Sequence, residues 1–218
     1  MYKFKLVSLL ITFFALIIAS EWVNIENANQ IAENVRVDNS DIFTTTLTFN
    51  IDGYELISVN GESGNIIRLE NGAQILEKGA PDLPMKSASI IIPDDKKMEV
   101  RVVNSVYTDY PNFNILPSKG NLSRLVNPET IPYKYGKTYS ENNFYPNNIV
   151  ELRDPYILRD VRGTSVVYYP IQFNPVTNTL RVYSEITVEV YSNGVGVVNV
   201  LDRENAPVSR SMEFQNIY

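Results

Sequence analysis

A regular alternation of apolar and polar residues over residues 180–191 constrains the fold more than any other feature of the chain. Its apolar members are Leu180, Val182, Ile186, Val188 and Val190. Because side chains of an extended strand point alternately to its two faces, this period places the apolar members on one face. The segment therefore predicts a long antiparallel strand that is buried on one face and solvated on the other.

Other segments share this β-rich texture. Residues 42–51, "IFTTTLTFNI", are rich in β-branched and aromatic side chains, which favour strands. Asn-Gly pairs at 60–61 and 71–72 stand between apolar runs, a strong hairpin signal. No helical period precedes the last dozen residues. We therefore expect an all-β fold, an antiparallel two-sheet β-sandwich of jelly-roll type over residues 41–195.

The first twenty residues have the layout of a secretory signal peptide. Lys3 and Lys5 precede a continuous apolar run over residues 6–18. This run is short for a helix that spans a bilayer, so we expect residues 1–20 to be cleaved and no stable membrane span to remain. An uncleaved anchor is the alternative. In either case the rest of the chain is expected to be exported, to the cell surface or beyond.

The segments that flank the predicted sandwich are polar. Residues 21–40 are rich in asparagine and are interpreted as a polar leader. Residues 196–218 are interpreted as a linker, in which Ser209 or Ser211 caps the start of a short helical tail. A helix that begins so near the last residue suggests that a further segment follows in the natural protein. The alternative is a frayed tail.

Composition and charge exclude several classes of function. With 19 basic and 25 acidic residues the chain has a net charge of −6, which argues against nucleic acid as its partner. It contains no cysteine and no histidine, so these 218 residues hold neither a thiol nucleophile nor a Cys/His zinc site. We expect no metal and no cofactor. An enzyme that uses carboxylates is disfavoured because no acid/base pair can be assigned, and we expect no catalytic activity.

Three stretches carry a family resemblance: "EKGAPDLPMKSASIIIP" (77–93), "ILPSKGNLSRL" (115–125) and the segment 144–190. They contain, in this order, Gly-x-Pro-x-Leu-Pro, Pro-Ser-Lys-Gly, Tyr-Pro, Arg-Asp-x-Arg-Gly and Phe-Asn-Pro followed by Leu-x-Val-Tyr. The order and spacing resemble the N-terminal propeptide of gingipain-type secreted cysteine peptidases. The resemblance covers about half of the chain.

The resemblance implies a β-sandwich prodomain that assists folding of a gingipain-type cysteine peptidase domain and keeps it latent. It also implies that a surface loop offers a basic side chain to the substrate pocket of that peptidase. No peptidase domain occurs within the 218 residues. The peptidase partner would therefore follow in cis on a longer chain, or be met in trans by a free-standing relative.

The loop over residues 115–137, here called the basic loop, suits this role. It contains four cations: Lys119, Arg124, Lys134 and Lys137. A peptidase that cleaves after Arg or Lys has an acidic pocket, which one cation on an extended backbone could block. Arg124 is ranked ahead of Lys119 because a guanidinium binds carboxylates in a bidentate manner, and Gly120 permits close backbone approach. The other two lysines are weaker candidates. The alternative is that all four are ordinary solvated cations.

Two further groups of arginines have candidate roles. Arg153, Arg159 and Arg162 could dock the peptidase, although an Asp/Arg surface network that ends at a turn is the favoured explanation. Arg203 and Arg210 would suit release by trypsin-like cleavage, and a polar linker explains them equally well.

A different class of function stays open beside the prodomain. An exported β-sandwich could be a binding module for a surface protein or a carbohydrate, because a β-sandwich fold is compatible with both a prodomain and a binding module. A carbohydrate binder would be expected to expose tryptophan or paired aromatic rings on one face, and the chain has one tryptophan, Trp22.

Overall fold

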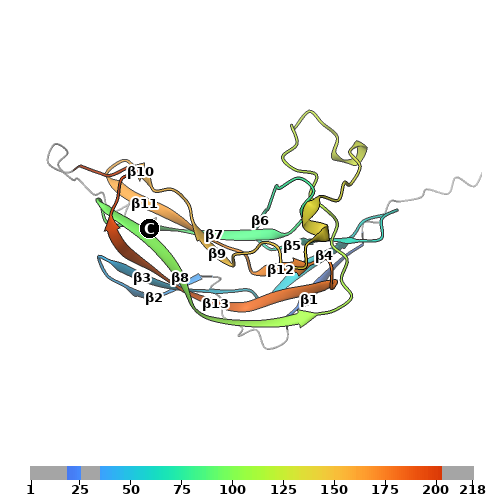
Figure 1. The fold of residues 1–218 in the computed structure, drawn as a ribbon, viewed down its shortest axis with the longest axis horizontal. Helices are drawn as coiled ribbons and strands as arrows, with labels where there is room; N and C mark the ends of the chain where they lie inside the picture. Colours follow the sequence, from blue (N-terminus) through green and yellow to red (C-terminus); the bar gives the residue numbers. More distant parts are fainter. Residues whose placement is uncertain (1–18, 26–34, 203–218) are drawn as a thin grey trace, which may run out of the picture.

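The structure is a computed structural model that describes residues 19–25 and 35–202 (Figure 1). Residues 1–18 of the predicted signal peptide, the predicted processing residues Arg203 and Arg210, and the predicted helical tail lie outside the described residues.

In this described part, the regular elements are strands and two short 3-10 helices. The strands are β1 (Ala19–Asn24), β2 (Val35–Ser40), β3 (Thr44–Asn50), β4 (Gly53–Ser58), β5 (Asn65–Arg68), β6 (Ala73–Gln74), β7 (Pro84–Ile91), β8 (Lys96–Tyr110), β9 (Val150–Leu152), β10 (Tyr156–Leu158), β11 (Val161–Tyr168), β12 (Ile171–Asn174) and β13 (Thr179–Val195). The 3-10 helices are η1 (Pro128–Thr130) and η2 (Lys137–Ser140).

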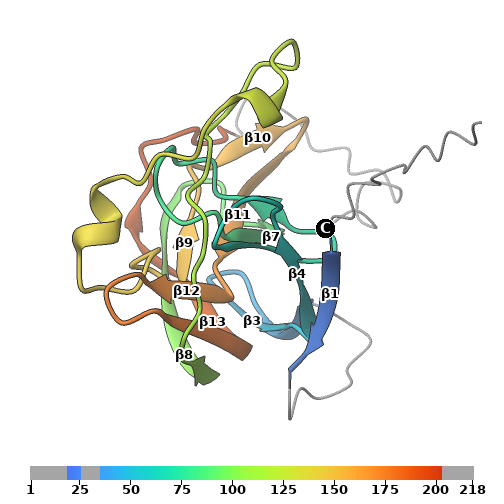
Figure 2. The same cartoon turned by 90° about the vertical axis from the view of Figure 1, so that its right-hand side faces the viewer.

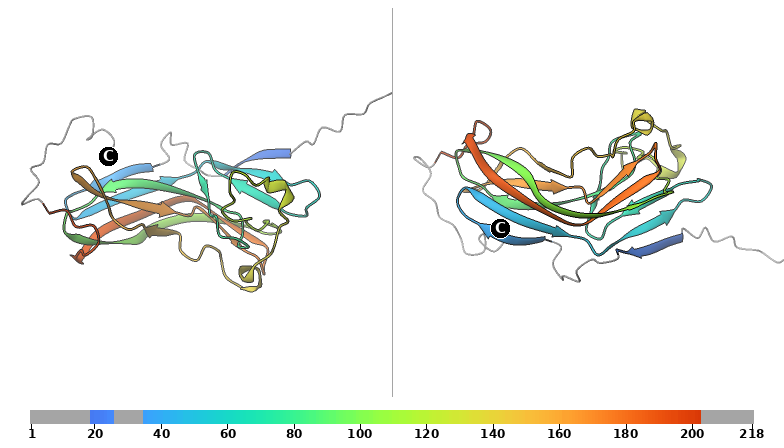
Figure 3. Two further views of the ribbon diagram at one scale, coloured as in Figure 1. Left: turned by 90° about the horizontal axis from the view of Figure 1, so that it is seen from above. Right: turned by 60° about the horizontal axis from the view of Figure 1, so that its bottom comes forward.

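The strands form three antiparallel sheets. The first has the order β12-β13-β3-β2, with β8 paired along the opposite side of β13. The second has the order β10-β11-β7-β6, with β9 also paired to β11. Figures 1 and 3 show these two sheets as stacked layers, and the third sheet, β1-β4-β5, at one end. The prediction of an all-β antiparallel sandwich is confirmed, and the small third sheet extends it.

Part of the predicted polar leader forms strands instead. β1 pairs with β4 from Ala19 opposite Ser58 to Asn24 opposite Gly53, and β2 pairs with β3. β2 is exposed at every position after Val35, and Val35 and Val37 are its two apolar residues, too few to show a period of two. Backbone pairing at a sheet edge needs no hydrophobic pattern, which is why composition suggested a leader here.

A bulge in β13 divides the interior into two hydrophobic cores. Leu180 and Val182 belong to one core, and the apolar residues from Ile186 onward belong to the other. Between them the register with β8 shifts after Tyr183, and Ser184 has no register partner. An extra residue turns the following side chains to the opposite face of the strand. The apolar residues of this alternation therefore belong to two cores. Tyr183, which the alternation places opposite the apolar members, is only 6% exposed.

Tyrosines are fully buried in both cores. Tyr54 packs in the core that contains Leu180, and Tyr168 packs in the other, where its ring stacks on Phe49 with centroids 4.0 Å apart. This stack joins β3 of the first sheet to β11 of the second. Removal from water disfavours the phenolate, so burial raises the pKa of Tyr168 and raises the pKa of Tyr54 to about 12.

Arg162 is a structural residue of the second sheet. It is 1% exposed and its guanidinium donates to backbone carbonyls alone: Asn199 O at 2.8 Å, Pro93 O at 2.6 Å, Lys96 O at 2.8 Å and Val198 O at 2.9 Å. These bonds tie the segment after β13 to the segment between β7 and β8. This enclosure disfavours the docking role predicted for Arg162, because all the bonds that its guanidinium donates go to carbonyls of its own chain.

We expect Arg162→Leu to lower the free energy of unfolding by about 2–4 kcal/mol, because four carbonyls lose a buried donor. Urea unfolding followed by tryptophan fluorescence measures the change. Arg153→Ala is the matched control, since its exposed pair with Glu151 at 3.1 Å is worth no more than about 1 kcal/mol. Equal effects of the two substitutions would contradict a structural role for Arg162.

We also expect stability to fall with alkaline pH. The ordinary tyrosine pKa is 10.0, and that of Tyr54 in the folded protein is about 12. The folded state therefore holds a proton that the unfolded state releases, so stability is full below pH 10 and declines as pH rises toward 12. Urea unfolding of wild type and Tyr54→Phe between about pH 8 and about pH 12 tests this linkage. The variant should show a shallower decline, and an unchanged slope would contradict it.

Candidate functional site

The connection between β8 and β9 spans residues 111–149 and contains the basic loop together with η1 and η2. It projects from one end of the sandwich, as the yellow-green segment in Figures 1 and 2 shows. Connections of this length without strands are uncommon in compact domains and are usually functional.

The first arm of the basic loop is anchored in the core. Ile115 and Leu116 are fully buried. The backbone of Asn65 bonds to this arm twice: Asn65 N donates to Asn114 O at 2.8 Å, and Leu116 N donates to Asn65 O at 2.9 Å. The hydroxyl of Tyr139 donates to Ile115 O at 2.7 Å. The loop therefore leaves the body of the protein from a rigid base.

A close backbone contact joins the two arms of the loop to the segment before β7. Gly79 N donates to Ser118 O at 2.9 Å, and Ser118 N donates to Ala80 O at 2.7 Å. From the second arm, Gly136 N donates to Gly79 O at 2.8 Å. Gly79 has a φ of +87°, and a Cβ there would lie 3.2 Å from the backbone of Gly136. Both glycines are thus needed for this approach.

The tip of the basic loop is a tight turn. Val126 N donates to Ser123 O at 3.0 Å, and Leu125 N lies 3.4 Å from the Ser123 hydroxyl. Arg124 and Leu125 occupy the two corners of this turn, and Leu125 is 96% exposed. Arg124 is also exposed, and it makes no hydrogen bond or ion pair with any residue that the structure describes. The turn therefore presents a free guanidinium beside a bare apolar side chain.

Lys119 is held within the loop. Its Nζ donates to Pro128 O at 2.9 Å and lies 4.0 Å from the centroid of the Tyr133 ring, where cation–π attraction stabilises it. Gly120 follows with a φ of +82°, and its N donates to the Ser118 hydroxyl at 3.2 Å. The structure therefore brings Lys119, Gly120 and Arg124 into one loop. Lys119 connects the two arms, whereas Arg124 has no hydrogen-bond or ion-pair partner among the described residues.

The weaker candidates also differ from one another. Lys134 is exposed and has no carboxylate partner among the described residues. Lys137 forms an ion pair with Glu141 at 3.0 Å. Arg153 and Arg159 are both exposed. Arg159 lies in the turn between β10 and β11, which Figure 1 shows at the end of the sandwich away from the basic loop. Arg153 lies between β9 and β10, where it lines a cavity with Ala73 of β6 and Met85 of β7. The predicted docking arginines are thus not gathered beside the loop.

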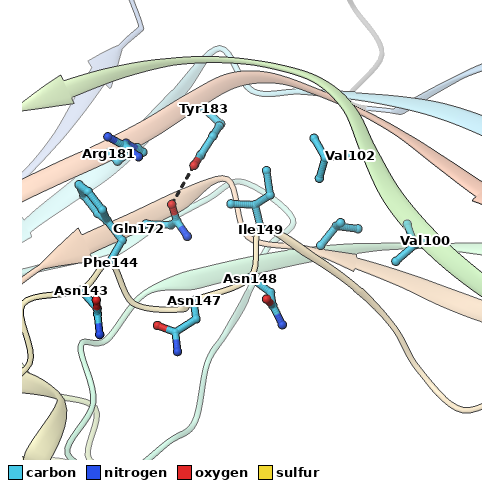
Figure 4. Close-up of a pocket in the computed structure, with 11 residues that line it drawn as sticks. Val100, Val102, Asn143, Phe144, Asn147, Asn148, Ile149, Gln172, Arg181 and Tyr183 are labelled. Carbon is cyan, nitrogen blue, oxygen red and sulfur yellow. Dashed lines mark hydrogen bonds between the residues drawn. The ribbon is translucent and has the colours of Figure 1, made fainter.

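An open groove of about 670 Å³ lies between β8, β12, β13 and the segment before β9 (Figure 4). Arg181 lines this groove, and its guanidinium donates two hydrogen bonds of 2.8 Å to Asp109. The same guanidinium lies 4.1 Å from the ring centroids of Tyr107 and Phe144. The pairing with Asp109 raises the pKa of Arg181 further above its ordinary value.

The amide at the floor of this groove is also satisfied internally. Gln172 donates to Pro146 O at 2.6 Å and accepts from the Tyr183 hydroxyl at 2.8 Å, the contact drawn in Figure 4. Trp22, the side chain that a carbohydrate module would expose, lies on β1 outside the groove. Arg181 and Gln172 are thus already paired within the protein, and the exposed polar side chains left in the lining are Asn143, Asn147 and Asn148.

Two further expectations concern metals and membranes. Among the described residues, no three or more carboxylates gather closely enough to hold a metal ion. In residues 19–25 and 35–202, no helix has the length and hydropathy needed to cross a membrane.

The chain is similar to known proteins over most of its length. It is 41% identical over 174 residues to Gingipain R1 of Porphyromonas gingivalis, which is 78% of this chain and 18% of that protein. It is 41% identical over 158 residues to Gingipain R2 of the same organism, 72% of this chain and 22% of the relative. The chain thus spans about a fifth of the length of these relatives.

Two solved structures share the fold. The complex of P. gingivalis RgpB pro- and mature domains contains a chain that matches with a TM-score of 0.72 and 39% identity, over 75% of this chain and 88% of that one. A structure that concerns the zymogenic latency of gingipain K matches with a TM-score of 0.67 and 20% identity, over 81% of this chain and all of that one. At that identity it supports the fold alone.

The sequence model of the family Propeptide_C25 matches residues 27–202, which include the whole sandwich from β2 to β13. This confirms the resemblance carried by the Gly-x-Pro-x-Leu-Pro, Pro-Ser-Lys-Gly and Arg-Asp-x-Arg-Gly motifs. The chain belongs to the Propeptide_C25 family.

Proposed function

We propose that this domain keeps a gingipain-type cysteine peptidase latent and assists its folding, and that Arg124 occupies the substrate pocket of that peptidase. The observation that carries the proposal is the free guanidinium at the corner of an anchored turn. The 39% identity to a chain from a complex of pro- and mature domains supports a peptidase domain as the partner.

Arg124 suits the substrate pocket better than Lys119 for two physical reasons. A blocking cation must reach a carboxylate in the peptidase pocket, and a side chain with existing partners would first have to give them up. Lys119 would lose its bond to Pro128 and its contact with Tyr133, whereas Arg124 would lose only water. A planar guanidinium also binds a carboxylate through two parallel hydrogen bonds, which adds geometric specificity.

The anchored base of the loop lowers the cost of binding. Backbone ordering on association costs free energy that a preformed loop does not lose again. The Gly79–Gly136 contact and the Lys119–Pro128 bond order both arms before any partner arrives. The peptidase would lie in cis on a longer chain or act as a separate protein, and export by the N-terminal apolar segment would bring both to the same compartment.

We expect Arg124→Ala to raise the inhibition constant for an Arg-specific mature gingipain domain by about 100-fold, since a buried charged pair is worth about 2–5 kcal/mol on truncation. Residual peptidase activity is measured against increasing concentrations of the purified domain. Arg153→Ala, which removes an exposed cation outside the basic loop, should leave the inhibition constant unchanged. Equal potency of wild type and Arg124→Ala would exclude Arg124 as the blocking residue.

We expect Lys119→Ala to act indirectly, as the loss of a positioning residue. Amide hydrogen exchange over residues 121–130 should become faster, because the contacts with Pro128 and Tyr133 are lost. The inhibition constant should rise by about 10-fold, less than for Arg124→Ala. Lys119→Arg, which retains a cation over the tyrosine ring, should keep most of the wild-type protection of these amides from hydrogen exchange. If Lys119→Ala raised the inhibition constant more than Arg124→Ala and left amide hydrogen exchange unchanged, Lys119 would be the blocking residue instead.

A further inference from the structure

Four of the cations that form no ion pair among the described residues lie in or beside the basic loop. Most Lys and Arg side chains of the described sheets are paired, as in Lys97 with Glu99 at 2.7 Å, Arg101 with Glu189 at 2.7 Å and Arg181 with Asp109. By contrast, no such pair is formed within the described residues by four cations in or beside the basic loop: Lys78, Lys119, Arg124 and Lys134. Positive charge is therefore left unneutralised at this end of the molecule.

Three of these cations share one small cavity. Lys78, Lys119 and Lys134 line a cavity of about 190 Å³ together with Ser118, Ile131 and Pro132. The backbone bond between Gly136 and Gly79 fixes the segments that carry Lys134 and Lys78 next to each other. Lys78 also contacts the loop, since a Cβ at Gly120 would lie 3.0 Å from the Cβ of Lys78. We call these three lysines the cationic rim.

The charge of the rim is opposite to that of the whole protein. The basic loop has four cations and one carboxylate, Glu129, which gives it a net charge of +3, whereas the whole chain has −6. Lys78 adds a further positive charge beside its base. A cationic patch on an otherwise acidic protein creates a field that orients the molecule toward a partner of negative charge.

We propose that the cationic rim is a second part of the interaction surface, which binds an acidic surface around the substrate pocket of the peptidase. This inference rests on the proposed function, but it assigns a different task to different residues. Arg124 enters the pocket and controls dissociation, while the rim speeds association through long-range attraction and fixes the approach of the loop. Charge at the edge of an interface acts mainly on the association rate and on its salt dependence.

The test measures association and dissociation rates of the purified domain on an immobilised, catalytically inactivated mature gingipain domain, at about 20 mM and about 300 mM salt. For the double variant Lys78→Gln/Lys134→Gln we expect association at low salt to slow by about 10-fold and dissociation to change by less than about 2-fold. The difference from wild type should shrink at high salt because ions screen the attraction.

The matched control is Lys96→Gln/Lys97→Gln, which changes the net charge equally at the start of β8, where both lysines have carboxylate partners. It should associate at nearly the wild-type rate. If both double variants slowed association equally, net charge alone would explain the effect and the proposed role of the cationic rim would be wrong. If the Lys78→Gln/Lys134→Gln variant kept wild-type rates, the role of the rim would also be wrong, but the proposed role of Arg124 would be unaffected. If wild type itself does not bind, the proposed function and the rim both fail.

Discussion

β13 is the constraint on which the rest of the structure depends. It pairs with β8 along nearly its whole length and with β12 and β3 on the other side, so it holds the first sheet together. The bulge after Tyr183 then turns its apolar side chains from one core to the other. One strand thus supports both cores, and the loop that follows β8 starts from the end of this pairing, where Tyr110 lies opposite Leu180.

The position of the basic loop follows from this arrangement. β8 delivers the chain to the end of the sandwich, and buried Ile115 and Leu116 fix it there before it turns outward. The Gly79–Gly136 contact closes the base, and Lys119 holds the two arms together through Pro128. The remaining residues at the tip are free to meet a partner. Rigidity at the base and a free cation at the tip are the two properties that a preorganised inhibitor needs.

Much of the architecture was predictable because it depends on local pattern. The alternation after Leu180 and the Asn-Gly turns specify antiparallel strands without any knowledge of their partners. The bulge after Tyr183 was not predictable, because it is set by pairing with β8, which is distant in sequence. β1 and β2 were missed for the opposite reason, since exposed edge strands need no apolar face.

The candidate site was also predictable in part. The family resemblance and the composition together selected the basic loop, and guanidinium chemistry supported the choice of Arg124 within it. The sequence alone could not show that Lys119 binds Pro128 and Tyr133, or that Arg162 is buried and donates to four carbonyls. Both facts depend on contacts between segments that are distant in sequence. A glycine within "KYGK" (134–137) indicates a close backbone approach, but only the structure shows that the partner of Gly136 is Gly79.

The most direct test is a crystal structure of this domain bound to a mature gingipain domain. We expect the guanidinium of Arg124 to lie inside the substrate pocket, with two nitrogens at about 2.7–2.9 Å from one carboxylate. We also expect Lys119 to keep its bond to Pro128. A complex in which Arg124 points to bulk solvent while another side chain fills the pocket would contradict the account.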